Sequence, residues 1–465
     1  MRISPPFSSA LVGRHKLRWK VVWLLLLPGI KTILMSKWTH HWLRIYCWSG
    51  VLLITLLYPL LHTEKYLAKG FTYAVMAFLL LGAIVGWRRL WQQLDRQTQT
   101  FLGLLLIWYI YLLLGGYGFS LAYPEADRRF YVASEILLKF LLPFLLLPFL
   151  YRCRVFNLEW FKGVVFLAAL TATLVLAYDW GTGLPRGQRL AAGPIMYGNL
   201  AMLSGVLAAL LALYDKRLVV RLALGVVALG SMAASFYSGT RGGWILLLSL
   251  PLLYGWTLKA QVDRRYVLAG GVGIILVFVA TYLLDTPVKK RLDQAVYEVS
   301  RLISDEQYRQ GSIGERVAMW EVAGSAFQSA PLTGIGLGNF YAYKKQMIEA
   351  GEAPANIMRY KHEHSLYMTL LGSTGLIGVL LFVGVFALLW SRFKKAALAG
   401  RSPTSKLLGQ MGLIVLLAYL DFGLSESYLF THRGAAAFFF LITVLLFLIS
   451  RTEAKPSPAL TGSSS

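Results

Sequence analysis

Long apolar runs recur along most of the chain, and short polar connections separate them. A helix needs about 20 residues to cross a bilayer, so runs of this length predict membrane-spanning helices. The composition agrees, because 57% of the residues are hydrophobic and only 15% are charged, unlike a soluble globular protein. We expect an all-α polytopic membrane protein with about twelve spans, at residues 45–62, 67–87, 101–119, 133–150, 160–178, 194–213, 218–237, 242–258, 266–284, 365–390, 407–425 and 434–450.

One long polar segment, residues 285–364, interrupts this pattern between the ninth and tenth spans. Apolar residues follow Pro287 at helical spacing, namely Leu292, Val296, Val299 and Ile303. This spacing predicts an amphipathic helix, and a helix of that kind is suited to lie on a membrane surface.

A second helix is expected later in the same segment. Ser312, with Glu315 three residues later, matches the capping box that begins helices, and Pro331 marks the end of the helix. Arg316 falls on the apolar side of this helix, where an unpaired guanidinium is costly. Its partner is either an acidic neighbour, Glu315 or Glu321, or an anionic ligand.

These patterns divide the chain into five parts. We expect a basic cytoplasmic extension, the first nine spans, an outer loop with amphipathic helices, the last three spans and a disordered cytoplasmic tail. Their boundaries are residues 1–44, 45–284, 285–364, 365–450 and 451–465.

The basic residues give a net charge of +24, which by itself suggests a nucleic-acid partner. They recur between the apolar runs, however, in connections such as "WRRLWQQLDR", "VDRRY" and "SRFKKAALAGRSPTSK". Short loops rich in Lys and Arg stay on the cytoplasmic side, which places the N-terminus inside. Nine spans then precede the long polar segment, so that segment lies outside, and the charge needs no nucleic acid.

Chemistry-bearing residues on the outer side include Arg241, Arg316 and His364. Arg241 stands in the turn "YSGTRGGW", whose glycines at 242 and 243 let a backbone or a lipid head group come close. His364 stands at the start of the tenth span, where the helix N-terminus favours a neutral imidazole that can accept a proton. The alternative is that each residue only anchors the end of a span or forms a local ion pair.

Taken together, these residue types suit transfer of a group from a lipid diphosphate. Two guanidinium groups can neutralise a pyrophosphate leaving group as its charge develops. A neutral histidine can take the proton from an attacking hydroxyl. The hypothesis therefore requires Arg241, Arg316 and His364 to converge in space.

Three stretches resemble elements of the O-antigen ligase and polymerase superfamily, in the same order. "HSLYMTLLGSTGLIG" is similar to its H-[NS]-x-x-L/Y…G-L-x-G signature. "ERVAMWEVAGSAFQSAPLTGIGLGNF" is similar to its R-x-x-x-W…P-x-x-G-x-G-x-G-x-F element, and "SGTRGGW" to its S-x-x-R-G-x-W element. The resemblance covers roughly residues 100–450.

The resemblance implies a GT-C-like glycosyltransferase fold in the cell inner membrane and an inverting reaction without metal or cofactor. The ligase branch moves O-antigen from undecaprenyl pyrophosphate to lipid A-core in the periplasm. By this likeness His364 is the general base, and Arg241 and Arg316 bind the pyrophosphate. Arg189 resembles a further outer arginine of the family, although the usual Asn-Pro-Asn does not follow it.

Several alternatives remain open at this point. An O-antigen polymerase or a ligase that glycosylates pilin shares the donor chemistry and differs in the acceptor. A polysaccharide or lipid transporter belongs to a different class and predicts charges at mid-span; only Lys139 fits that prediction clearly. Glu125 and Asp127 have the spacing of a metal-binding carboxylate pair, but Arg128 and Arg129 beside them favour surface ion pairs.

Overall fold

The computed structural model describes residues 37–120, 134–183, 193–257, 287–305 and 309–453, together with single positions between 258 and 286. Every regular element in these residues is helical, which confirms the expected all-α polytopic class. The chain divides into two units, Met1–Leu52 and Leu53–Ser465. The packing described below lies within the second unit.

Within the described residues, nine segments are long and apolar enough to cross a membrane. They correspond to nine of the expected spans. Of the other three, 67–87 lies within a long helix, 242–258 forms a shorter helix that ends in a π-helical turn, and 266–284 falls mostly outside the described residues. The helices of this membrane part are α2 (Lys37–Leu60), α3 (Lys65–Trp91), α4 (Arg96–Ser120), η2 (Leu138–Leu141), α6 (Leu142–Cys153), α7 (Leu158–Gly181), α8 (Pro194–Tyr214), α9 (Leu218–Ser238), α10 (Arg241–Leu252) with its turn η3 (Leu253–Thr257), α16 (Thr374–Ala399), α17 (Pro403–Gly423) and α18 (His432–Glu453).

Helix α18 is the centre of the bundle. It is apolar on all sides, and 94% of its most apolar window is buried, against 33% for α4 and α9. A helix that is hydrophobic all round is a core helix when protein covers it on every side. Helices α17, α6, α8 and α3 provide this cover.

The predicted fourth span contains the short 3₁₀ helix η2 directly before α6. Its mid-span charge, Lys139, is buried and donates a hydrogen bond to the backbone carbonyl of Glu135 at 2.8 Å. The ammonium also lies 3.6 Å from the ring centroid of Tyr73. Because a carbonyl and an aromatic face satisfy the charge, Lys139 needs no transport role to explain it.

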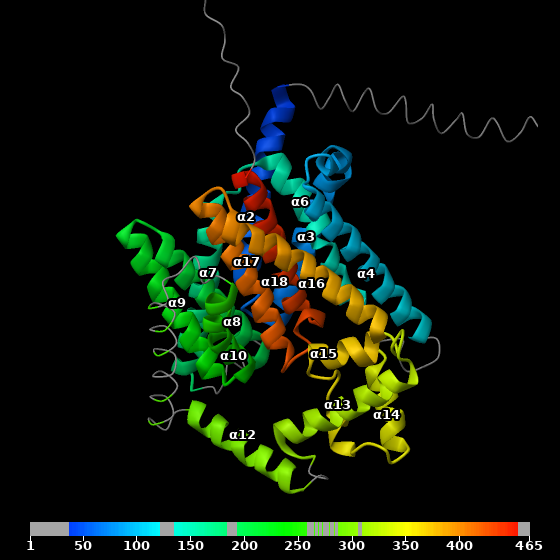
Figure 1. Ribbon diagram of the computed structural model, residues 1–465. Helices are drawn as coiled ribbons and strands as arrows, with labels where there is room; N and C mark the ends of the chain where they lie inside the picture. Colours follow the sequence, from blue (N-terminus) through cyan, green and yellow to red (C-terminus); the bar gives the residue numbers. More distant parts are fainter. Residues whose placement is uncertain are drawn as a thin grey trace, which may run out of the picture. The chain divides into compact units, whose positions relative to one another are not determined.

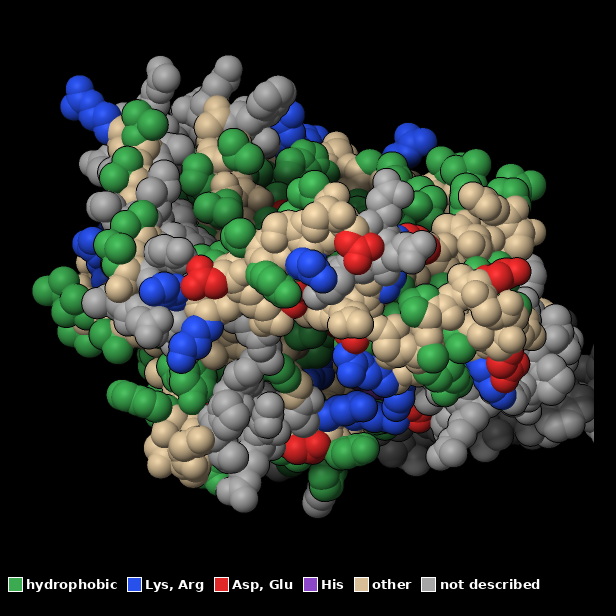
Figure 2. Space-filling model, turned by 90° about the horizontal axis from the view of Figure 1, so that it is seen from below, with side chains coloured by type: hydrophobic (Ala, Val, Ile, Leu, Met, Phe, Trp, Pro, Cys, Tyr) green, Lys and Arg blue, Asp and Glu red, His purple; other side chains and the backbone are tan. Residues whose placement is uncertain are grey.

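The long polar segment places shorter helices across one end of this bundle (Figure 1), namely α12 (Pro287–Ser304), α13 (Gly311–Ser329), α14 (Phe340–Glu349) and η4 (Ala355–Arg359). Viewed onto this end, hydrophobic side chains share the surface with small groups of basic and acidic ones (Figure 2). The expected apolar face of α12 contributes to this surface, because Val296 is 69% exposed and Ile303 is 80% exposed.

The start of α13 differs from the prediction. Ser312 lies inside the helix rather than at its cap, and Gln310 precedes the helix without a capping hydrogen bond. Glu298 of α12 replaces the capping box: its carboxylate accepts the backbone N–H of Ile313 at 2.8 Å and the hydroxyl of Ser312 at 3.1 Å. The capping-box prediction was wrong because a residue from another helix satisfies the free N–H groups. The predicted end before Pro331 is confirmed, since α13 ends at Ser329.

A glycine-rich turn fastens this segment to the membrane part. Ile335 N–H donates to the carbonyl of Gly372 at 3.0 Å, within the π-helical turn η5 (Thr369–Ser373) that follows the short α15 (Leu366–Met368) and precedes α16. A Cβ on Gly334 would lie 2.5 Å from the backbone carbon of Ser373. The turn needs glycine for this close contact and for left-handed backbone, at Gly334, Gly336 and Gly338.

Candidate active site

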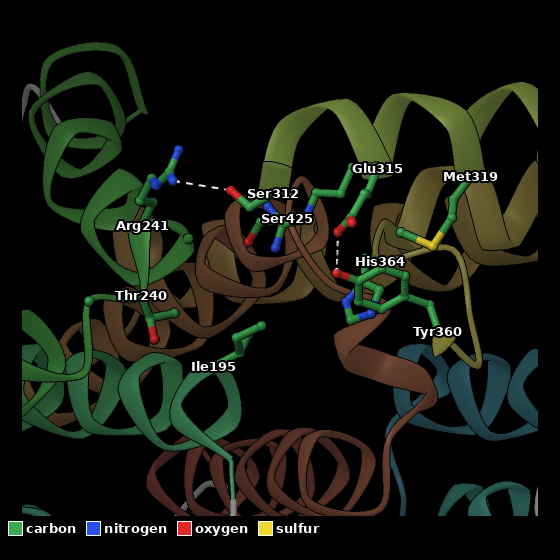
Figure 3. Close-up of a pocket in the computed structure, with 12 residues that line it drawn as sticks. Ile195, Thr240, Arg241, Ser312, Glu315, Met319, Tyr360, His364 and Ser425 are labelled. Carbon is green, nitrogen blue, oxygen red and sulfur yellow. Dashed lines mark hydrogen bonds between the residues drawn. The ribbon is translucent and has the colours of Figure 1, made fainter. Parts of the chain in front are cut away.

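A cavity of about 200 Å³ opens between the polar helices and the end of the bundle (Figure 3). Its walls come from the start of α8, the turn between α9 and α10, the first turns of α13, the loop after η4 and the loop between α17 and α18. Arg241, Arg316 and His364 all line it. The structure therefore brings together three side chains that lie far apart along the chain.

Arg241 is placed by the end of one helix and the start of the next. Gly239 ends α9 with a left-handed φ of 66°, Thr240 is extended, and α10 begins at Arg241. The Arg241 guanidinium donates a hydrogen bond from Nη2 to Ser312 Oγ at 3.3 Å (Figure 3). Its position in the first turn adds the positive end of a helix dipole to its own charge, and both favour an anion.

The glycines after Arg241 serve packing. A Cβ on Gly242 would lie 2.3 Å from Ser425 Oγ, and one on Gly243 would lie 2.8 Å from Ser235 Oγ. The atoms nearest to these glycines belong to neighbouring side chains, and the expected approach of a lipid head group stays a prediction. This contact holds the start of α10 against the loop between α17 and α18.

Replacing Gly242 by alanine is expected to lower the free energy of unfolding by about 1–3 kcal/mol, the usual effect of overpacking. The apparent melting temperature in detergent measures the change. Gly225→Ala is the matched control, because a Cβ at that helical glycine meets nothing within 4 Å. Combining Gly242→Ala with Ser425→Gly should recover the loss; an unchanged deficit in the double variant would contradict this explanation.

Arg316 lies on α13 and is partly buried at the cavity. Both acidic neighbours proposed as its partners are engaged elsewhere. Glu315 pairs with Arg359 Nη2 at 2.5 Å and accepts the Tyr360 hydroxyl, and Glu321 pairs with Arg309 at 2.5 Å. Among the described residues, the Arg316 guanidinium forms neither an ion pair nor a hydrogen bond.

Burial lowers the pKa of Arg316, while the nearby carboxylates of Glu426 and Glu298 oppose that change. A guanidinium remains charged even so, because its ordinary pKa is far above neutrality. Arg316 therefore holds a permanent positive charge whose hydrogen-bond donors remain available to an anion in the cavity.

His364 stands just before the short helix α15, with Ser365 as its N-cap. Its backbone has a φ of 51°, in the left-handed region that residues with a side chain seldom adopt. The imidazole Nδ1 lies 2.8 Å from Glu426 Oε2, and the ring of Tyr360 packs edge-on at 5.2 Å between centroids. These contacts engage Nδ1 of the imidazole and leave Nε2 available to a substrate group.

Glu426 is the functional residue that the sequence interpretation missed. It lies in the loop between α17 and α18, its side chain is only 3% exposed, and its other oxygen lies 3.2 Å from His362 Nδ1. Burial alone would raise the pKa of Glu426, but His362, His364 and Arg316 outweigh it and lower the pKa to about 2. The carboxylate is therefore ionised near neutrality and favours the tautomer of His364 that carries its proton on Nδ1.

Three residues named in the sequence analysis lie outside the described residues: Arg189, Glu125 and Asp127. Their proposed roles stay predictions.

A family model described as O-antigen ligase matches residues 224–383. A protein of Haemophilus influenzae, described only as uncharacterized, is 23% identical over 216 residues, which cover 45% of this chain and 52% of that protein. The alignment thus spans about half the length of this relative. The segment matched by the family model contains Arg241, Arg316 and His364. The match supports membership of the chain in the O-antigen ligase and polymerase superfamily.

Proposed function

We propose that this protein is an inverting glycosyltransferase, an O-antigen ligase. It transfers O-antigen polysaccharide from undecaprenyl pyrophosphate to a sugar hydroxyl of lipid A-core on the periplasmic side of the inner membrane. The observation that carries the proposal is one cavity lined by Arg241, Arg316 and His364, in which the Arg316 guanidinium forms no ion pair or hydrogen bond with another described residue.

The two arginines suit the donor diphosphate. Arg241 comes from the start of α10 and Arg316 from α13, so they can approach a diphosphate from two elements. Charge develops on the leaving oxygen as the glycosidic bond to phosphate breaks, and guanidinium groups held in place stabilise that charge. Arg189 is a third candidate for this role, on the family resemblance alone.

His364 suits the acceptor hydroxyl. In the proposed reaction the hydroxyl oxygen bonds to the anomeric carbon from the side opposite the diphosphate, and its proton moves to His364 Nε2. The carboxylate of Glu426, at 2.8 Å from Nδ1, keeps Nε2 unprotonated beforehand and stabilises the imidazolium afterwards. Glu426 is thus a positioning residue that acts through the histidine.

Replacing Glu426 by glutamine is expected to lower kcat by roughly 10²–10⁴-fold, because an amide can donate to Nδ1 and select the wrong tautomer. KM for the donor should change little, since the arginines remain. Initial rates with purified protein measure both. A rise in KM with an unchanged kcat would contradict the positioning role.

The distribution of charge supports a periplasmic cavity. The cavity lies at the end where α9 and α17 finish and α10 and α18 begin. The connection from α16 to α17 lies at the other end of α17 and carries Arg401, with Lys394 and Lys395 near the end of α16 and Lys406 near the start of α17. Basic short loops mark the cytoplasmic side, which leaves the cavity on the outer side.

The most direct test is transfer in vitro with a defined lipid-pyrophosphate donor and a lipid A-core acceptor. Formation of the glycosylated acceptor is expected. A deletion strain separates the nearest alternatives: loss of a ligase leaves lipid-linked polymer unattached to core, and loss of an O-antigen polymerase leaves single repeat units. A ligase for pilin would instead glycosylate a protein acceptor.

Transport is the alternative from a different class. It requires charged residues along a path through the membrane, whereas the mid-span candidate Lys139 is satisfied by Glu135 and Tyr73. Transport activity that survives both His364→Ala and Arg316→Ala would favour a transporter.

The reaction is expected to need no metal, because the arginines supply the positive charge that a cation supplies in metal-dependent transferases. EDTA should leave the initial rate of purified enzyme within about twofold of the untreated rate, a difference below about 0.5 kcal/mol. Strict dependence of the rate on Mg²⁺ or Mn²⁺ would contradict this expectation and would make Glu125 and Asp127 the candidate metal ligands.

A further inference from the structure

Two histidines and a glutamate gather at the edge of the cavity. His362, His364 and Glu426 each offer one ligand atom, and these atoms all lie within 4.8 Å of one another. The two oxygens of Glu426 divide between the histidines, at 3.2 Å from His362 Nδ1 and 2.8 Å from His364 Nδ1. The catalytic proposal uses the pair His364–Glu426 and leaves His362 unexplained.

The spacing of these atoms matches a known coordination chemistry. Zn²⁺ binds imidazole nitrogen and carboxylate oxygen at about 2.0–2.2 Å in tetrahedral geometry, so neighbouring ligand atoms lie about 3.3 Å apart. The two nitrogen–oxygen separations, one to each oxygen of Glu426, fall within about 0.5 Å of that value, and all three residues have ligand atoms within 4.8 Å of one another. Two histidines and one glutamate, with the fourth position open, form a ligand set that zinc commonly takes.

The surroundings allow a cation to reach this cluster and be held there. Glu426 is 3% exposed, which supplies a fixed buried anion, while the side chains of His364 and His362 are 16% and 39% exposed. The cluster therefore combines a buried carboxylate with two histidine side chains that are partly exposed, although His362 Nδ1 itself is buried. The planes of the two imidazole rings are tilted by 43°, with centroids 4.2 Å apart.

We propose that His362, His364 and Glu426 form a Zn²⁺ site and that zinc bound there switches off His364 as a base. Binding does not depend on the proposed function, whereas the inhibition rests on it. The site lies on the same side as the cavity, so the ion comes from the compartment that supplies the substrates.

The reason for inhibition is the tautomer. A metal on Nδ1 requires the lone pair of that nitrogen, so the single proton of the neutral ring must sit on Nε2. The hydrogen bond with Glu426 requires the reverse, with the proton on Nδ1. Zinc therefore places an N–H where the acceptor hydroxyl needs a lone pair, and it also removes Glu426 from its positioning role.

Binding is tested first, with full-length purified protein, its affinity tag removed and its metals stripped. Isothermal titration with ZnCl₂ is expected to show one site. His362→Gln should weaken that site by at least about 100-fold, since even loss of a partner outside the ligand shell costs about 10–100-fold. His432→Gln is the matched control: it removes a histidine 3.8 Å from Glu135, outside the cavity, and should leave affinity unchanged. Absence of saturable binding, or equal affinity in His362→Gln, would overturn the site.

Activity is measured next on the same proteins. Zn²⁺ should inhibit wild-type transfer with a midpoint that matches the binding constant, and EDTA should reverse the inhibition. His362→Gln should keep its rate without zinc within about twofold and resist inhibition by at least about 100-fold, while Mg²⁺, which prefers oxygen ligands, should not inhibit either protein. Stimulation by zinc, or equal inhibition of both proteins, would overturn the switch. Absence of transfer in zinc-free wild-type protein would instead count against the proposed function and leave the binding result standing.

Discussion

Replacing His364 by alanine is expected to abolish transfer while the protein remains folded and inserted. General base catalysis contributes about 10²–10⁴-fold to a rate, and the cavity offers no second imidazole, since His364 is the one histidine among its lining residues. The loss should appear in kcat, because the arginines that hold the donor are untouched. Initial rates over a range of donor concentrations distinguish a loss in kcat from a rise in KM.

The control for that experiment is the neighbouring histidine. His362→Gln removes an imidazole whose centroid lies 4.2 Å from that of His364 but which does not line the cavity. It should retain transfer in metal-free buffer. Similar losses in both variants, or a loss below tenfold in His364→Ala, would count against His364 as the base.

Replacing Arg316 by methionine is expected to lower kcat/KM by at least about 10²–10³-fold, the effect of removing one charge-stabilising donor. The same change should raise the apparent melting temperature of the ligand-free protein in detergent, by about 2 °C or more. The reason is that a partly buried guanidinium without an ion pair among the described residues is costly to desolvate. Arg316→Met should therefore be less active and more stable than the wild-type protein.

Arg309 on the same polar segment supplies the matched control. Its guanidinium pairs with Glu321 at 2.5 Å, and Glu321 is 54% exposed. The Arg309 side chain is 22% exposed; a partly exposed pair contributes only about 1 kcal/mol, so Arg309→Met should leave transfer nearly unchanged and should not raise the melting temperature. A marked loss of stability in Arg316→Met would show that Arg316 has a structural partner instead.

The membrane part of the fold could be predicted because its signal is local. The length of an apolar run decides whether a helix can cross the bilayer, and the runs for α8, α9 and α18 need no knowledge of their neighbours. The expected end of α13 at Pro331 follows equally from local chemistry. The start of α13 was missed because its free N–H groups are capped by Glu298 of α12, a contact between two helices that no spacing rule contains.

The candidate site likewise contains residues that local sequence signals predict and one residue that only a tertiary contact identifies. Arg241, Arg316 and His364 stand in recognisable motifs, and Arg241 and His364 each lie beside a helix start whose chemistry favours the proposed role. Glu426 is 62 residues away from His364 along the chain, in a loop with no motif of its own. Its one local signal is an acidic residue within a short connection between apolar helices. Only the packing of α17 and α18 shows which histidines it faces.

The left-handed backbone at residue 364 has a consequence for protein engineering. A side chain in that conformation costs about 1–2 kcal/mol, and glycine avoids the cost. Directed evolution for thermal stability alone would therefore favour glycine at position 364. The resulting protein would be more stable but inactive, because it would lack the proposed base. Variant libraries aimed at a more robust enzyme should hold this codon fixed.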